Sequence, residues 1–505
     1  MLEQTRKGKS YVAGQWVNSG AGDFFVYNPA DTDKVVGVVS VATKTEIDKA
    51  VDAANEALKT WGHEWSWVKR AEVIDDLVQL VKEHQEDIVK FGAWESGKIV
   101  NEMRADVIEG IHMFQVCAGR GRQPIGHKIS SEIPEKDAET CLSPRGVCSV
   151  ITPWNFPFAI PTWLIGPALV SGNPVIFKPS EETPLTGQFL VELFAEVAKK
   201  HNVPPGVLNL VHGAGEVGDY LVRHPGTVGQ LFTGSNEVGA AIKKIAAAHH
   251  DKFAVCEMGG KNSLIILKDA NLELAVNAAI LSAYKTTHQR CVSADLIIVE
   301  ESIEPEFTKR FLEMTDRVRF GDPFDLNSFA GPLINNDAVL KFATTAELVV
   351  NECDEILRFS AVTTPPGLPN SNFVRPFVVR MRHRPNTHAL RNEFFTPIVV
   401  IVPVKDFEEA LFVANDTEYG LSMALITEDY RKMREFKMRG KAGLKYVNLP
   451  TIGAEVHLPF GGMRRSGTGM PSAAWLLNYM CHETAYTVNC GHEIKMAQGL
   501  SAKTN

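Results

Sequence analysis

Apolar residues near the amino terminus recur at the spacing of amphipathic helices. Between Ile47 and Leu58 they stand three, four and seven positions apart, and Thr43 and Glu46 just before them have capping-box spacing. A longer pattern with the same period runs from about Val68 to Phe91. We therefore predict two helices here. Because they precede the repeating part of the chain, we expect them to cover its sheet.

From Gly146 onward the pattern changes to short β-branched runs separated by helical stretches. Strands are predicted over 147–151, 174–177, 207–211, 228–232 and 253–257, and helices over stretches such as 187–200 and 238–248. This alternation is typical of a doubly wound parallel sheet. Polar motifs at the carboxyl ends of the strands should then meet in one cleft.

A second α/β half begins with a strand over 263–267, includes another over 296–299 and continues to Gly462. Two segments fit neither half, namely a hairpin over 128–141 and an isolated strand over 484–490. Lone strands need partners, so both segments are candidates for pairing with another subunit. We expect a homodimer or homotetramer.

Composition narrows the class of protein. A chain of 505 residues leaves room for two to four domains of ~100–200 residues each. Its 45% apolar and 22% charged residues argue against disorder, and its net charge of -8 argues against nucleic acid or an acidic membrane surface as the main partner.

Cysteine usage and apolar runs indicate the compartment. The eight cysteines include no C-x-x-C pair and no zinc-like Cys/His spacing, so we predict no metal and a reducing environment. No apolar segment follows the basic residues at the start of the chain. The most apolar run, 158–172, contains two prolines and is shorter than the ~18 residues of a spanning helix. We expect a cytoplasmic protein that does not enter membranes.

Three side chains form one chemical set: the thiol of Cys291, the carboxylate of Glu257 and the amide of Asn155. The thiol can add to a carbonyl, the amide can hold the resulting oxyanion, and the carboxylate can activate water to release the acyl group. Each also has an ordinary structural alternative: a buried small residue, a solvated charge and a helix cap, respectively. The set oxidises aldehydes if a hydride acceptor lies beside it.

Seven motifs occur in the order and approximate spacing of the aldehyde dehydrogenase superfamily, which the chain resembles from about residue 10 to residue 490. They are Pro153 to Pro157, Lys178 to Glu181, Phe232 to Ser235, Glu257 to Lys261, Gln289 to Cys291, Glu393 to Phe395 and Pro459 to Gly462. The resemblance implies an α/β fold with a Rossmann-like cofactor domain, an α/β catalytic domain and a small β oligomerisation element. We assign these to residues 1–123 with 142–258, 259–470, and 124–141 with 482–496.

The resemblance also implies roles for individual residues. Cys291 would be the nucleophile, Asn155 the oxyanion donor together with a backbone N–H, and Glu257 the base that hydrolyses the thioacyl intermediate. The implied cofactor-binding residues are Trp154, Lys178, Ser180, Glu181, Gly213, Phe232, Thr233, Gly234, Ser235, Val238, Glu393 and Phe395. The implied substrate-binding residues are Phe156, Trp163, Arg290, Val292 and Phe460, where Arg290 has a structural ion pair as its alternative.

The implied cofactor is NAD. The carboxylate of Glu181 at the adenosine ribose would repel the additional phosphate of NADP, but Lys178 could attract that phosphate, so NADP stays an open alternative. The motif Gly213 to Gly218 has G-x-G-x-x-G spacing. In the family the pyrophosphate lies at the element over 232–239 instead, so the resemblance implies a position near adenine only for Gly213 and Gly215.

The chain departs from the family pattern in several places, two of which are single residues in the motifs. His288 and Thr396 stand where the family commonly has glycine. A side chain at His288 narrows the backbone options of the nucleophile loop, and this histidine could help proton transfer or bond locally. Arg290 and the loop 450–457 resemble branches that take amino-acid-derived semialdehydes, so we expect such a substrate.

Two rival functions stay open. In a coenzyme A-acylating relative the thioester would pass to a thiol, but such relatives usually lack a glutamate at the position of Glu257. A structural relative without activity would not need the intact set of Asn155, Glu257, Cys291 and Lys178. Both features favour an aldehyde dehydrogenase that releases a free acid.

Overall fold

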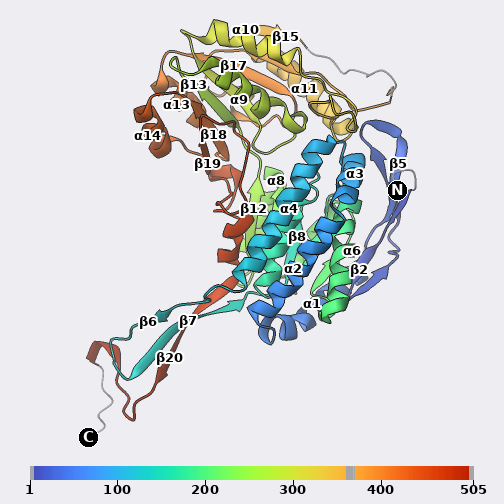
Figure 1. The fold of residues 1–505 in the computed structure, drawn as a ribbon, viewed down its shortest axis with the longest axis vertical. Helices are drawn as coiled ribbons and strands as arrows, with labels where there is room; N and C mark the ends of the chain where they lie inside the picture. The colour runs from blue at the N-terminus through green and yellow to red at the C-terminus, as the bar shows by residue number, and fades with distance from the viewer. Residues whose placement is uncertain (1–4, 360–367, 369, 500–505) are drawn as a thin grey trace.

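The computed structural model describes residues 5–359, 368 and 370–499, and Figure 1 shows two α/β bodies and a thin arm. The first body contains a seven-stranded sheet with the strand order β12-β11-β8-β9-β10-β2-β3. Its strands are β2 (Ser10–Val12), β3 (Gln15–Val17), β8 (Cys148–Ile151), β9 (Val175–Lys178), β10 (Leu208–Leu210), β11 (Gly229–Gly234) and β12 (Phe253–Met258). The five from β8 to β12 are parallel and confirm the five predicted strands to within three residues.

The helices of the first body account for the amphipathic patterns. They are α1 (Lys44–Ala57), α2 (Trp67–Glu83), α3 (Gln85–Ser96), α4 (Val100–Arg120), α5 (Ala159–Val170), α6 (Pro184–His201), α7 (Gly215–Arg223) and α8 (Asn236–Ala247), with a π-helical turn (Leu58–Gly62) after α1. The capping box of Thr43 and Glu46 is present at α1.

The prediction of a single helix from Val68 to Phe91 is wrong. The backbone leaves the helical conformation at His84, where φ is -98° and ψ is 10°, and α2 ends there as α3 begins. A break of one residue hardly disturbs the apolar period, so the sequence pattern does not reveal it. Helix α4, which the sequence did not predict, lies beside α2 and α3 (Figure 1) and also packs against α5.

The second body contains another seven-stranded sheet, with the order β15-β16-β17-β14-β13-β18-β19. Its strands are β13 (Asn262–Ile266), β14 (Ala294–Glu300), β15 (Glu355–Arg358), β16 (Phe377–Arg380), β17 (Ile398–Val404), β18 (Ser422–Ile426) and β19 (Leu444–Val447). Around them are α9 (Leu272–Tyr284), α10 (Glu304–Thr315), α11 (Asn336–Glu352), α12 (His388–Arg391), α13 (Phe407–Asn415) and α14 (Tyr430–Arg439). Strands β13, β14, β17 and β18 are buried along their whole length, which explains their nearly continuous apolar sequences.

The arm consists of β6 (Lys128–Ile129), β7 (Lys136–Pro144) and β20 (Cys481–Asn489) in the order β20-β7-β6, and it projects away from both bodies (Figure 1). The prediction that the strand over 484–490 is isolated is wrong, because β20 pairs with β7 of the same chain. This pairing places Thr484 opposite Cys141. Sequence reasoning missed this pairing because more than 300 residues separate the strands. Strand β20 is an exposed edge strand, so pairing with another subunit stays a prediction.

Two further features complete the fold. A small sheet of β1 (Arg6–Gly8), β5 (Asp31–Ser40) and β4 (Asp23–Asn28) lies beside the first body (Figure 1). The most apolar run folds as α5, which is buried along its whole length. Within the described ranges, no helix has the length and apolar character needed to cross a membrane. The division into domains at residues 123, 141 and 258 stays a prediction.

Candidate active site

The predicted convergence of strand ends is confirmed, because motifs that follow β8, β9 and β11 line one cavity of about 540 Å³. A second cavity of about 290 Å³ adjoins it and reaches the thiol-bearing loop. The two cavities share Pro153, Trp154, Thr233, Gly234 and Ser235. Together they form one continuous site that joins both bodies of the chain.

The larger cavity offers groups suited to a dinucleotide. At its β9 side, the Lys178 ammonium is 3.4 Å from a Glu181 carboxylate oxygen, and burial lowers the pKa of Lys178. On the opposite side α8 begins, and the Ser235 hydroxyl caps it by accepting a hydrogen bond from the Val238 N–H at 3.4 Å. A helix amino terminus attracts phosphate, and a carboxylate accepts hydrogen bonds from ribose hydroxyls. Ser180 and Phe232 also line this cavity.

Two of the three glycines of the G-x-G-x-x-G motif border the larger cavity, and a position of Gly213 near adenine stays a prediction. Gly215 and Gly218 line the larger cavity, whereas Gly213 is absent from its described lining. Gly213 has a φ of +149°, and a Cβ there would collide with the Val217 side chain. Gly213 is therefore required by the turn between β10 and α7, and this backbone need explains its glycine without a cofactor contact.

The thiol of Cys291 faces the smaller cavity together with Asn155. The Asn155 amide donates a hydrogen bond to the Gln289 carbonyl at 2.9 Å, which joins the end of β8 to the nucleophile loop. The Asn262 amide holds the same loop from the other side by donating to the Cys291 carbonyl at 2.7 Å and to the Ser293 carbonyl at 2.8 Å. These amide contacts fix the backbone on both sides of the thiol.

The surroundings of Cys291 favour the neutral thiol. Burial raises its pKa above the ordinary value, and the nearby carboxylates of Glu257 and Glu393 add to the rise, while Arg290 opposes it. The side chains of the site alone therefore keep Cys291 as a neutral thiol. Ionisation requires a base or a positive charge brought by a bound molecule.

Glu257 is buried at the end of β12, and in the described part of the chain neither carboxylate oxygen accepts a hydrogen bond of good geometry. Burial raises its pKa well above the ordinary value, and the backbone N–H of Gly462 only partly opposes this. A buried carboxylate without partners accepts a proton readily. That property suits a general base.

Glu393 folds back over the turn that follows β12. It accepts a hydrogen bond from the Gly260 N–H at 3.0 Å, and burial, followed by the charge of Asp295, raises its pKa to about 7. Nearby, the rings of Trp154 and Phe395 meet edge to face at 5.8 Å. All three side chains line the smaller cavity.

Comparison with known proteins identifies this arrangement. The model of the aldehyde dehydrogenase family matches residues 16–485. The chain belongs to the aldehyde dehydrogenase family. It is 34% identical to alpha-ketoglutaric semialdehyde dehydrogenase of Bacillus subtilis strain 168 (91% of this chain and 93% of that protein) and 35% identical to 1-pyrroline-5-carboxylate dehydrogenase of Geobacillus sp. strain WCH70 (87% and 85%). A crystal structure of Staphylococcus aureus betaine aldehyde dehydrogenase in complex with NAD+ superimposes with a TM-score of 0.91 at 29% identity (96% and 95%).

Most of the aromatic residues that the family resemblance implies for substrate binding lie in the hydrophobic core. Trp163 and Phe460 meet edge to face at 4.9 Å within the core cluster that also contains Val292, and none of the three is among the described lining residues of the two cavities. The Phe156 ring has the Lys98 ammonium 3.9 Å from its centroid and the Arg290 guanidinium at 5.1 Å.

Arg290 makes the structural ion pair that was its alternative. Its Nη2 lies 3.5 Å from a Glu102 carboxylate oxygen, and its Nε donates to the Thr286 hydroxyl at 2.8 Å. Glu102 comes from α4, far away in the sequence. The spacing of motifs gives no sign of this contact. Lys98 was missed for the same reason, although its ammonium donates to the Asn155 carbonyl at 3.0 Å.

His288 makes local hydrogen bonds rather than facing the thiol. Its Nδ1 donates to the Ala283 carbonyl at 2.6 Å, and its Nε2 donates to the Asp295 carboxylate at 2.7 Å. With both ring nitrogens engaged, the imidazole has no free nitrogen to pass a proton to Cys291. This confirms the local role over the proton-transfer role. Asp295 itself was missed because an isolated aspartate in an apolar strand carries no motif.

Proposed function

We propose that this aldehyde dehydrogenase converts an aldehyde to the free carboxylic acid and transfers a hydride to NAD. One observation carries the proposal: Cys291 and Asn155 lie together in a cavity continuous with a dinucleotide-sized space, and Glu257 is close enough to influence the thiol's pKa. The aldehyde would enter beside Cys291, and the nicotinamide end would lie near Glu393 and Phe395.

The chemistry follows from the groups present. The Cys291 sulfur forms a bond to the carbonyl carbon as a base takes the thiol proton, and the carbonyl oxygen becomes an oxyanion held by the Asn155 amide and a backbone N–H. Bound NAD supplies the hydride acceptor, which leaves the substrate as a thioester on Cys291. Glu257 then takes a proton from water, whose oxygen bonds to the acyl carbon as the carbon–sulfur bond breaks.

The residues around the larger cavity fit NAD. We assign the pyrophosphate to the amino terminus of α8 and the adenosine ribose to Lys178 and Glu181. A carboxylate at this ribose would repel the additional phosphate of NADP. The likeness to a betaine aldehyde dehydrogenase in complex with NAD+ supports the same choice. We assign the nicotinamide ribose to Glu393.

We further propose a semialdehyde as the substrate. The Bacillus subtilis relative is named for alpha-ketoglutaric semialdehyde, and Arg290, although paired with Glu102 at 3.5 Å, keeps a guanidinium beside the nucleophile. A substrate carboxylate could share this guanidinium. A panel of semialdehydes and plain alkyl or aryl aldehydes, followed at the NADH absorbance band, tests this. Higher kcat/KM for the plain aldehydes would refute it.

The experiment that tests the reaction itself is Cys291→Ser. NADH production should disappear, while NAD binding measured by calorimetry should be unchanged, because the thiol is the nucleophile and the larger cavity lies apart from it. Retained turnover would refute the assignment. Reactions with and without coenzyme A separate hydrolysis from acyl transfer, and strict dependence on coenzyme A would favour the acylating rival.

We also propose a cytoplasmic homodimer or homotetramer. All eight cysteines are free, as expected in a reducing compartment, and the exposed edge strand β20 offers a surface for pairing between subunits. Light scattering after size exclusion tests the assembly. A monomer at micromolar concentration would refute it.

A further inference from the structure

Three consecutive residues before the nucleophile adopt the left-handed conformation that favours glycine. Thr286, Thr287 and His288 have φ values of 53°, 54° and 66° in the 3₁₀ turn Lys285–His288. Each such residue costs on the order of 1 kcal/mol or more, so surrounding contacts must hold the turn. The Thr286 N–H donates to Glu102 at 2.9 Å, the Thr287 hydroxyl donates to the Gly331 carbonyl at 2.7 Å, and His288 donates from both ring nitrogens.

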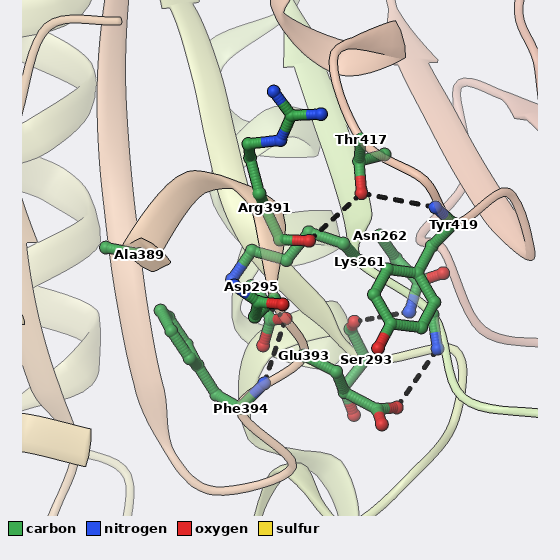
Figure 2. Close-up of polar contacts among 12 residues, drawn as sticks. Lys261, Asn262, Ser293, Asp295, Ala389, Arg391, Glu393, Phe394, Thr417 and Tyr419 are labelled. Carbon is green, nitrogen blue, oxygen red and sulfur yellow. Dashed lines mark hydrogen bonds and ion pairs between the residues drawn. The ribbon is translucent and has the colours of Figure 1, made fainter. Parts of the chain in front are cut away.

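The Asp295 carboxylate is where the contacts of this turn meet those of two other segments. It accepts the His288 Nε2–H at 2.7 Å, lies 3.1 Å from the Lys261 ammonium and accepts the Phe394 N–H at 3.3 Å. Figure 2 shows the last contact, and Glu393 directly precedes Phe394 in the chain. His288, Asp295 and Lys261 are each buried. One carboxylate therefore ties together the nucleophile turn, the glycine turn before β13 and the Glu393 loop.

The contacts make this junction stiff. Both partners of His288 are oxygen atoms, so hydrogen bonds hold the imidazole ring from two sides. The Asp295 carboxylate lies between this buried ring and the buried Lys261 ammonium. Removing one member of a buried charge network leaves its partners unpaired, which is strongly unfavourable. A shift of any of the three segments would break a contact of this kind.

We propose that His288 and Asp295 form a positioning unit that sets the place of Cys291 and couples it to the Glu393 loop. This rests on the proposed function, because it assumes that Cys291 and Glu393 serve the same reaction. His288 and Asp295 are not among the described lining residues of the two cavities, so they act through the backbone they hold. Binding of the cofactor at Glu393 and the alignment of the thiol then depend on one buried carboxylate.

The test uses His288→Gly, Asp295→Asn and the double variant in the full-length protein. Glycine tolerates the left-handed backbone but releases the loop, so His288→Gly should lower kcat about 10- to 100-fold while the KM for NAD stays nearly unchanged. Asparagine cannot accept hydrogen bonds at both side-chain positions, so Asp295→Asn should lower kcat and also raise the KM for NAD. The double variant should be no worse than Asp295→Asn, because both changes break the same connection.

A second measurement does not depend on turnover. Alkylation of Cys291 by iodoacetamide, quantified on its peptide by mass spectrometry, should be faster in both single variants because the loop is less constrained. His201→Ala is the matched control, since it breaks another His–Asp pair, with Asp76 at 2.6 Å, far from the site. It should match the wild type in kcat, KM and alkylation. If His288→Gly does not fold, His288→Asn replaces it, because asparagine tolerates the left-handed region but is too short to span both acceptors.

The outcomes separate the two proposals. Folded single variants with wild-type alkylation rates and an unchanged KM for NAD would overturn the positioning unit, and so would additive losses in the double variant. If the wild type does not reduce NAD with any aldehyde tested, the proposed function fails. The alkylation comparison still decides whether His288 and Asp295 hold Cys291 in place.

Discussion

Replacing Gly259 with alanine tests the site through a single methyl group. Gly259 follows β12, and a Cβ built there would overlap both carboxylate oxygens of Glu393. Its φ lies outside the left-handed region, so alanine brings no backbone strain. The substitution should therefore act by displacing the Glu393 carboxylate from its hydrogen bond with the Gly260 N–H, 3.0 Å away.

The size of the effect on the KM for NAD follows from the hydrogen bond to the ribose that the displaced Glu393 carboxylate would lose. A hydrogen bond to a charged group contributes about 1.5–3 kcal/mol, so displacing Glu393 from the ribose position should raise the KM for NAD roughly 10- to 100-fold. The KM for the aldehyde should change much less, because Cys291 and Asn155 are held by separate hydrogen bonds with Asn262 and Gln289. The folded protein should keep nearly wild-type thermal stability, since the displaced carboxylate can move into the cavity.

Steady-state kinetics with varied NAD provide the assay, and calorimetric titration with NAD provides the binding constant. Gly119→Ala is the matched control: Gly119 lies in α4 with no atom within 4 Å of a Cβ, so the same methyl group should leave the kinetics unchanged. Gly259→Ala in a Glu393→Ala background should add no further loss, because the colliding carboxylate is absent. An equal additional loss in that background would refute the reasoning.

The carboxylates and the thiol of the site lead to four more predictions. Glu257→Gln should give a burst of about one NADH per site and then a steady-state rate ~10²–10⁴ lower than that of the wild type, because an amide side chain cannot activate the deacylating water. Stopped-flow absorbance measures both phases, and loss of the burst itself would count against a purely deacylating role. Since burial raises the pKa of both Glu257 and Cys291, and each acts in its ionised form, kcat/KM should increase from neutral to alkaline pH, and a profile falling over this range would contradict the assignment. Because a carboxylate accepts ribose hydrogen bonds better than a carboxylic acid, and the pKa of Glu393 is about 7, the KM for NAD should rise as the pH falls below about 7 in the wild type but not in Glu393→Gln. Glu181→Ala should lower the KM for NADP only a few-fold, since Glu181 is about half exposed and such ion pairs contribute up to ~1 kcal/mol. An unchanged ratio of the KM for NADP to the KM for NAD would argue against the place of Glu181 at the ribose.

The alternation of apolar runs and amphipathic stretches determined the five parallel strands of the first sheet, because buried parallel strands and the helices between them are specified locally by their own residues. Strands β8 to β12 lie within three residues of their predicted positions, and the polar motifs at their carboxyl ends do meet, as parallel strands require. The order of motifs likewise indicated Cys291 and Asn155 as members of one site.

Only the tertiary structure decided what surrounds those residues. The pairing of β20 with β7, the ion pair of Arg290 with Glu102 and the junction at Asp295 each join segments that are distant in the sequence or carry no motif. The need for glycine at Gly213 is also tertiary, because a Cβ there would collide with the Val217 side chain. The hydrophobic pattern of a segment indicates which of its residues are buried. Which charges face one another depends on how the segments pack, and the pKa values of Cys291, Glu257 and Glu393 depend on that packing.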